Sequence, residues 1–195
     1  VARGYTDPRS HPHFDDARTY CSICNRNCGV ILSEPSNPWV SGVASLFTKE
    51  FYRFLRRHLA PDGVMVQWIQ CYEIDDRLLG TMVAALIEVF PHVDVYLTNT
   101  SDLLFVSSGQ PLPSLDAKAL ASEPLHSELA HVGLVGPSDF AVRRIGSERL
   151  LQAYVRYSDV QPHSDFYPVV SPYGPPPRFM RVSFTIILTF FHRRL

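Results

Sequence analysis

A short apolar run at residues 30–32 ends in a hydroxyl and a carboxylate, Ser33 and Glu34, and the Pro-rich loop after them leads into an amphipathic stretch. This order of strand, loop and helix is typical of an open α/β sheet, where ligands bind at the carboxyl ends of the strands. Because Glu is seldom fully buried without a partner, a carboxylate at a strand end indicates a chemical role. The alternative is a loop whose polar groups only satisfy backbone donors at the start of the next helix.

The rest of the chain shows the same alternation of strand-like and helix-like segments. Apolar residues at helical spacing predict helices at residues 17–25, 45–59, 75–90, 116–132 and 138–155. Apolar runs predict strands at residues 12–14, 29–33, 64–69, 93–97 and 103–106, with 29–33 buried and the last two paired as an antiparallel hairpin. A turn is expected at 60–63. This order predicts the α/β class: the second half of a Rossmann-like, methyltransferase-type sheet with a helical C-terminal appendage.

Length and composition limit the classes of partner. The 195 residues are enough for one domain with a core, and a net charge of -1 gives no basic field for nucleic acid. The apolar run at 182–191 is too short for a transmembrane helix, which needs about 20 residues. Because no signal peptide pattern precedes Cys21, Cys24, Cys28 and Cys71, we expect free thiols in a reducing compartment. The first three lack a second paired cluster, so we expect no metal site.

Five blocks of the chain, in order, resemble the spermidine synthase (polyamine aminopropyltransferase) family. They are Asp15-Asp16-Ala17-Arg18, Ser33 to Gly42, Leu59-Ala60-Pro61-Asp62-Gly63, Val66-Gln67-Trp68 and Ser164-Asp165-Phe166-Tyr167-Pro168. The likeness covers roughly residues 7–170 and is closer to a spermidine-synthase-like branch, often fused to membrane domains. It implies transfer of an aminopropyl or other alkyl group from a sulfonium nucleoside to an amine.

The resemblance also implies which residues hold the nucleoside. Asp16 stands where the family has a carboxylate that accepts a hydrogen bond from the adenine amino group, and Ala17 and Ser33 are the neighbouring cofactor-binding positions. The alternative role for Asp16 is the N-cap of the helix that begins near Ala17. Asp165 is expected to anchor the C-terminal segment over the site.

By the same resemblance, Glu34 stands where the family has its catalytic Asp, and it is the candidate base that takes the proton from the attacking amine. Glu is one methylene longer, which moves the carboxylate by about 1.5 Å, and misplacements of that order can cost roughly a hundredfold in rate. The candidate substrate-binding residues are Ser36, Asn37, Gln70 and Tyr72. Asn37 replaces a second family Asp that pairs with the polyamine, so a polyamine substrate is in doubt.

The chain has no Gly-x-Gly-x-x-Gly loop, which in this fold binds the nucleotide part of a cofactor. We therefore expect the chain to be the C-terminal part of a longer protein, holding about half of a nucleoside site and binding sulfonium nucleosides weakly by itself. The expected units are residues 1–110, the C-terminal half of a spermidine-synthase-like Rossmann-type domain; 111–170, the helical appendage; and 171–195, an irregular tail.

The function expected from these features is a spermidine synthase-like transferase whose donor is decarboxylated S-adenosylmethionine or S-adenosylmethionine and whose acceptor is a small amine. Three alternatives stay open: a nucleoside-binding or regulatory module without catalysis, an S-adenosylmethionine-dependent methyltransferase, and a non-functional fragment from a truncated reading frame. We expect a cytoplasmic protein, or a cytoplasmic domain of a membrane-anchored parent whose membrane helices lie outside this chain. Pairing into a homodimer is left open.

Overall fold

The strands form one mixed sheet in the computed structural model, which describes residues 6–36, 38, 40, 42–71, 74–99 and 102–168. The described strands are β1 (Cys28–Ser33), β2 (Leu59–Gln70), β3 (His92–Leu97), β4 (Asp102–Ser108) and β5 (Arg144–Ser147). Their order across the sheet is β1-β2-β4-β3-β5. β1 and β2 run parallel, and the other neighbours pair antiparallel. The expected α/β class and the hairpin of β3 and β4 are confirmed.

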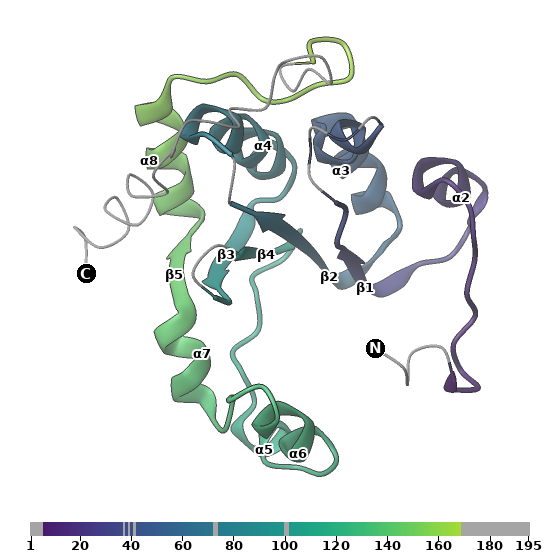
Figure 1. The fold of residues 1–195 in the computed structure, drawn as a ribbon, viewed down its shortest axis with the longest axis vertical. Helices are drawn as coiled ribbons and strands as arrows, with labels where there is room; N and C mark the ends of the chain where they lie inside the picture. The colour runs from purple at the N-terminus through teal and green to yellow at the C-terminus, as the bar shows by residue number, and fades with distance from the viewer. Residues whose placement is uncertain are drawn as a thin grey trace.

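The helices lie on both sides of this sheet (Figure 1). Those described are α2 (Ala17–Ile23), the 3-10 helix η1 (Val43–Phe47), α3 (Lys49–Arg57), α4 (Asp76–Val89), α5 (Ala117–Leu120), α6 (Leu125–Ala130), α7 (Pro137–Arg143) and α8 (Glu148–Ser158). α3 and α4 pack side by side over one face, and α8 packs against α4. The segment with α5, α6 and α7 lies on the opposite side (Figure 1).

The core lies between the sheet and the layer of α3, α4 and α8. α3 buries Phe51, Tyr52 and Leu55, while its arginines stay on the outer side, as the helical spacing predicts. α4 is buried on most sides because it lies between α3, α8 and the sheet. The fully buried large side chains are Tyr52, Tyr154, Phe47, Phe90, Phe105, Met65, Ile69, Met82, Leu86, Leu103 and Leu151.

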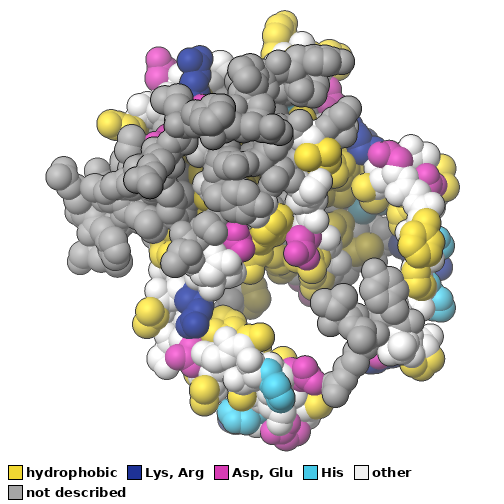
Figure 2. Space-filling view, in the orientation of Figure 1, with side chains coloured by type: hydrophobic (Ala, Val, Ile, Leu, Met, Phe, Trp, Pro, Cys, Tyr) yellow, Lys and Arg dark blue, Asp and Glu magenta, His cyan; other side chains and the backbone are white. Residues whose placement is uncertain are grey.

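The other face of β1 is not buried, so the prediction of a buried strand at 29–33 is wrong. Val30 and Leu32 are 66% and 65% exposed, because alternate side chains of a strand point to opposite faces and no described element covers this one. Figure 2 shows hydrophobic side chains along the upper margin of a hollow below the sheet. Further along this face, residues of β2, β3 and β4 and the segment 112–143 enclose a cavity of about 340 Å³.

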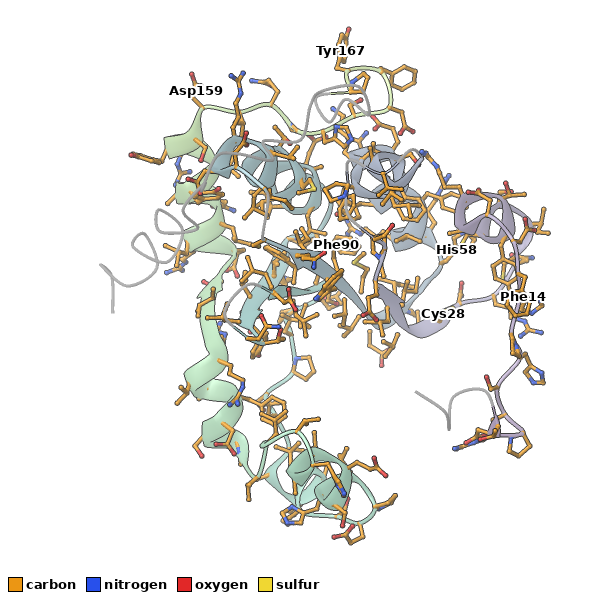
Figure 3. All side chains as sticks on the ribbon, viewed as in Figure 1. Phe14, Cys28, His58, Phe90, Asp159 and Tyr167 are labelled. Atoms are coloured by element: carbon orange, nitrogen blue, oxygen red, sulfur yellow. The ribbon has the colours of Figure 1, made fainter. Side chains whose placement is uncertain are left out.

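The predicted strand at 12–14 is also wrong. Residues 11–14 form no strand in the structure, and Phe14 is 93% exposed. The segment lies beyond α2, away from the sheet (Figure 3), so it has no neighbouring strand to pair with. An extended segment without a ladder partner leaves its backbone groups to water.

Two other elements differ from the expectation in their boundaries. The helix expected at 45–59 is broken at Thr48, whose side chain accepts a hydrogen bond from the Phe51 amide and begins α3 as its N-cap. The turn expected at 60–63 instead forms a bulge within β2, because Cys28 pairs with Leu59 whereas Val30 already pairs with Val64. Figure 3 shows Cys28 near His58, whose carbonyl accepts a hydrogen bond from the Cys28 amide.

The segment after residue 110 contains a strand that the sequence pattern did not predict. Residues 138–155, expected to be one helix, form α7, then β5, then α8. β5 pairs with β3 at the sheet edge, and Arg144 Nη2 donates to Asp94 Oδ1 at 2.6 Å across this pair. Within residues 116–132 two short helices stand in place of one. The tail expected at 171–195 lies outside the described residues, and the division into domains stays a prediction.

Candidate functional site

A cavity of about 280 Å³ opens at the carboxyl end of β1. One wall is α2, which contributes Ala17 and Cys21, and the floor is the end of β1 with the start of its loop, residues 31–35. The opposite wall consists of apolar side chains of η1 and α3: Leu46, Phe51 and Leu55. Three residues singled out from the sequence, Ala17, Ser33 and Glu34, therefore line one cavity.

Glu34 is exposed at the rim of this cavity, directly after β1. Among the described residues, no hydrogen bond or ion pair involves its carboxylate. A capping role would require a backbone N–H donor, and none of those described donates to Glu34. The carboxylate can therefore accept a proton or bind a cation that enters the cavity.

Asp16 is the N-cap of α2, so the alternative role considered for it is confirmed. Its Oδ1 accepts hydrogen bonds from the Thr19 amide at 2.9 Å and the Thr19 hydroxyl at 3.1 Å. These bonds stabilise the ionised carboxylate and lower the pKa of Asp16. Contact with an adenine amino group stays a prediction: Asp16 precedes the cavity-lining Ala17 and does not itself line the cavity.

Ser33 is connected to the core through a buried amide. Gln67 is fully buried opposite Ser33 in the β1–β2 pair, and its Nε2 donates to the Trp68 carbonyl at 2.9 Å and to the Ser33 carbonyl at 3.4 Å. The hydroxyl of the equally buried Tyr52 donates to Gln67 Oε1 at 3.5 Å. This chain of polar groups fixes the end of β1, and thus the residue that precedes Glu34.

The candidate substrate residues are not brought together by the described part of the chain. Ser36 is exposed in the loop and does not line the cavity. Gln70 is half-buried at the end of β2, where it pairs with Asp102 of β4, and it does not line the cavity either. Asn37 and Tyr72 lie outside the described residues. Substrate roles for these four residues stay predictions.

The α3 wall and Cys21 were not predicted from the sequence as parts of the site. Leu46, Phe51 and Leu55 belong to the apolar side of the segment expected as the helix 45–59, and an apolar face that packs next to a strand end also borders any cavity there. Cys21 is half-buried in the wall of α2, and burial raises the pKa of its thiol. Within the described ranges, no three His, Cys, Asp or Glu residues lie close enough together to hold a metal ion.

Comparison with known proteins shows the family to which the chain belongs. The family model described as "Spermine/spermidine synthase domain" matches residues 1–106, more than half of the 195 residues. The chain belongs to this family. The resemblance inferred from the five sequence blocks is thereby confirmed.

Curated relatives of this spermine/spermidine synthase family member include two bacterial enzymes. The polyamine aminopropyltransferase of Nitrosomonas europaea is 34% identical over 98 residues, which are 50% of this chain and 30% of that protein. The polyamine aminopropyltransferase of Moorella thermoacetica is 31% identical over 98 residues, 50% of this chain and 34% of that protein. The match thus spans about a third of each relative.

Solved structures share the fold of this family member. Spermidine synthase from Thermotoga maritima superposes with a TM-score of 0.62 at 18% identity, covering 80% of this chain and 53% of that one. A probable spermidine synthase from Corynebacterium glutamicum gives a TM-score of 0.56 at 20% identity, covering 84% and 57%. No described helix is long and apolar enough to cross a membrane.

Proposed function

We propose that the cavity beside Glu34 takes part in transferring an aminopropyl, or another alkyl group, from a sulfonium nucleoside to a small amine. The observation that carries this proposal is that Ala17, Ser33 and Glu34 line one cavity at the carboxyl end of β1. Ligands of open α/β sheets bind at the carboxyl ends of the strands. Family membership and the polyamine aminopropyltransferase relatives support the same reaction class.

The residues present suit part of such a donor. The apolar wall of Leu46, Phe51 and Leu55 offers a surface for a flat base or a methylene chain, and the exposed carboxylate of Glu34 attracts the ammonium of an amine acceptor. The donor proposed is decarboxylated S-adenosylmethionine, with S-adenosylmethionine as the second candidate. The proposed nucleoside residues are Asp16, Ala17 and Ser33, with Asp16 also capping α2.

In the proposed reaction the neutral amine nitrogen attacks the carbon attached to the sulfonium sulfur. A new carbon–nitrogen bond forms as the carbon–sulfur bond breaks, and the sulfur leaves as a neutral thioether with the electron pair. The amine then carries an extra proton, which passes to the carboxylate of Glu34. A carboxylate placed to take this proton contributes roughly a hundredfold to ten-thousandfold.

The class of amine that the proposed site accepts follows from the charge of its side chains. In the proposed site, Glu34 offers one carboxylate, and Asn37 offers an amide where aminopropyltransferases have a second Asp, so an amine with a single nearby positive charge fits better than a long polyamine. A nucleoside-binding module without catalysis is the second candidate, favoured by these same two departures. We further propose that the natural protein acts in the cytoplasm, and a homodimer is its proposed assembly.

The test measures turnover by the full-length protein that contains this chain, with both sulfonium donors and a panel of amines. Glu34→Gln keeps the size of the side chain but cannot take a proton, so turnover should fall by roughly a hundredfold or more while donor affinity barely changes. Glu88→Gln is the matched control, since Glu88 is an acidic residue of α4 that pairs with Lys49 and Arg53 outside the cavity. Equal activity of the two variants would overturn the role of Glu34.

Asp16 is tested in the same assay. Asn caps helices about as well as Asp, so Asp16→Asn should preserve α2 and the folded protein. If the charge of Asp16 holds an adenine amino group, the variant should need several times more donor for half-maximal rate. An unchanged donor requirement would leave Asp16 with its capping role alone.

A further inference from the structure

The segment that follows α8 returns across the helical layer and reaches α2. We call residues 159–168 the strap; Figure 1 shows it running from the end of α8 over α4 toward α3. His163 and Ser164 in its middle are almost fully buried, at 1% and 3% exposure. A strap with buried polar residues at its centre must make specific hydrogen bonds there.

Those bonds attach the strap to three elements. The His163 amide donates to the Thr81 carbonyl of α4 at 3.0 Å, and the His163 carbonyl accepts from the Lys49 amide of α3 at 3.0 Å. The His163 ring Nε2 lies 3.1 Å from the Ala44 carbonyl of η1. Glu50 of α3 accepts hydrogen bonds from the Ser164 hydroxyl and the Asp165 amide, both at 3.0 Å. The strap is therefore fixed before it reaches α2.

Asp165 then joins this fixed strap to α2 through Arg18. Arg18 Nη1 donates to Asp165 Oδ1 at 3.0 Å and Nη2 donates to Oδ2 at 2.6 Å, a two-pronged geometry that restricts both distance and direction. Nη1 also lies 3.3 Å from the Ser45 carbonyl of η1, and the guanidinium lies over the Phe51 ring at 5.6 Å. The hydrogen bond from Arg18 lowers the pKa of Asp165, so the pair is ionised at neutral pH.

α2 depends on this link because it has little else to hold it. None of its residues is buried, and Cys21 is only partly packed against the core. Yet α2 supplies one wall of the cavity, through Ala17 and Cys21, and Phe51 belongs to the opposite wall. Arg18 contacts both the strap and Phe51, so the ion pair sets the separation of the two walls.

We propose that Arg18 and Asp165 are positioning residues of the cavity: their ion pair holds the α2 wall against the α3 wall at the width that accepts the nucleoside part of the donor. This inference rests on the proposed function for the identity of the ligand. The wall positions themselves can be measured without any ligand, through the thiol of Cys21.

The first measurement is the rate at which iodoacetamide alkylates Cys21, followed by peptide mass spectrometry in a Cys24→Ser background. Arg18→Gln and Asp165→Asn should each raise this rate about three- to tenfold, since the loss of a charge-assisted pair frees α2. Arg18→Lys, which makes a single contact, should give an intermediate rate. The exchanged pair Arg18→Asp with Asp165→Arg should restore the slow rate.

The buried thiol of Cys71 is the internal control, because it is only 3% exposed and becomes reactive only when the core opens. Its rate should not change in any of these variants. Arg53→Gln is the matched control variant: it also removes an exposed ion pair of a helix, with Glu88, but away from the cavity. If Arg18→Gln alkylates Cys21 no faster than Arg53→Gln does, or if Cys71 reacts faster in parallel, the positioning role is overturned.

The second measurement separates this inference from the proposed function. In the natural protein, Arg18→Gln should raise the KM for the sulfonium donor about three- to tenfold, with kcat and the KM for the amine retained. An equal fall of kcat in Arg18→Gln and Asp165→Asn, with the donor KM unchanged, would overturn the positioning role. A wild-type protein that binds neither donor would overturn the proposed function instead, whatever the alkylation rates show.

Discussion

Replacing Gln67 by Leu tests how the end of β1 is held in place. Gln67 is fully buried, donates to the Trp68 and Ser33 carbonyls at 2.9 and 3.4 Å, and accepts from the Tyr52 hydroxyl at 3.5 Å. Leu has a similar size but no polar group, so it removes all three contacts at once. The residue that these contacts support, Ser33, immediately precedes Glu34.

The size of the effect follows from these distances. One well-formed hydrogen bond contributes about 1 kcal/mol net, and a buried polar group left without a partner costs about 1–3 kcal/mol. Because the bonds to Ser33 and from Tyr52 are long, the lower end of that range applies to both. We expect Gln67→Leu to reduce the free energy of unfolding by about 2–3 kcal/mol. For a chain of this length this lowers Tm by about 5–10 °C.

The Tyr52 hydroxyl gives the test its second arm. Tyr52→Phe removes only the long bond and should cost about 1 kcal/mol or less. In the double variant no hydroxyl is left without a partner, so the loss should be smaller than the sum of the two single losses. Urea denaturation of the four proteins measures this, with Gln70→Leu on the same strand as control. If Gln67→Leu lies within about 0.5 kcal/mol of the wild type, the reasoning is refuted.

Two further predictions concern the bulge in β2 and the strap. A Cβ added at Gly63 would lie 2.9 Å from the Cys28 carbonyl oxygen, whereas one at Gly29 meets nothing within 4 Å, so Gly63→Ala should cost about 1–3 kcal/mol and Gly29→Ala almost nothing in the same denaturation assay. Burial lowers the pKa of His163 below its ordinary 6.5, so the unfolded chain takes up the proton first and the free energy of unfolding should fall as the pH drops from about 7. His163→Gln should flatten that slope between pH 7 and 5, and an unchanged slope would contradict this assignment.

The sequence predicted those elements whose pattern is long and regular. α4 has apolar residues over four turns and an Asp75 N-cap, and the structure begins and ends it within one residue of the expectation. The hairpin of β3 and β4 was predicted because two strand-like runs flank a polar turn. In the structure the Asp102 amide donates to Asn99 Oδ1. In each case the local pattern and the tertiary packing favour the same structure.

Other elements were not predictable because partners distant in the sequence decide them. β5 is short and polar and becomes a strand by pairing with β3, through contacts such as Arg144 with Asp94. Residues 12–14 were expected to form a strand, but no described strand lies beside them. Asp165 pairs with Arg18, which is separated from it by 147 residues, and no local pattern identifies such a pair. The expected role of Asp165, to anchor the C-terminal segment over the site, stays a prediction.

Part of the candidate site was predictable because topology, rather than side-chain detail, assembles it. Ser33 and Glu34 lie at the carboxyl end of β1 whichever strand β1 pairs with. The helix that precedes β1, α2, must then run back along this strand. Ala17 was grouped with them through the family resemblance, and the structure places it in the wall of the same cavity. Its role in cofactor binding stays a prediction. The apolar wall and Cys21 depend on how closely α2 and α3 approach, which is set by packing and by the strap.

β4 runs antiparallel to β2, so the loops of this sheet differ in how near they lie to the candidate site. This difference affects where the fold tolerates added residues. β1 and β2 both finish at the end of the sheet that carries Glu34. β4 starts at the same end, since Asp102 pairs with Gln70. The strand ends that the β3–β4 turn joins, Leu97 and Asp102, therefore lie at the same end of the sheet as Glu34. Residues inserted between them would extend from that end of the sheet. Insertions after Ser108 would extend from the opposite end of the sheet and leave the cavity entrance as it is.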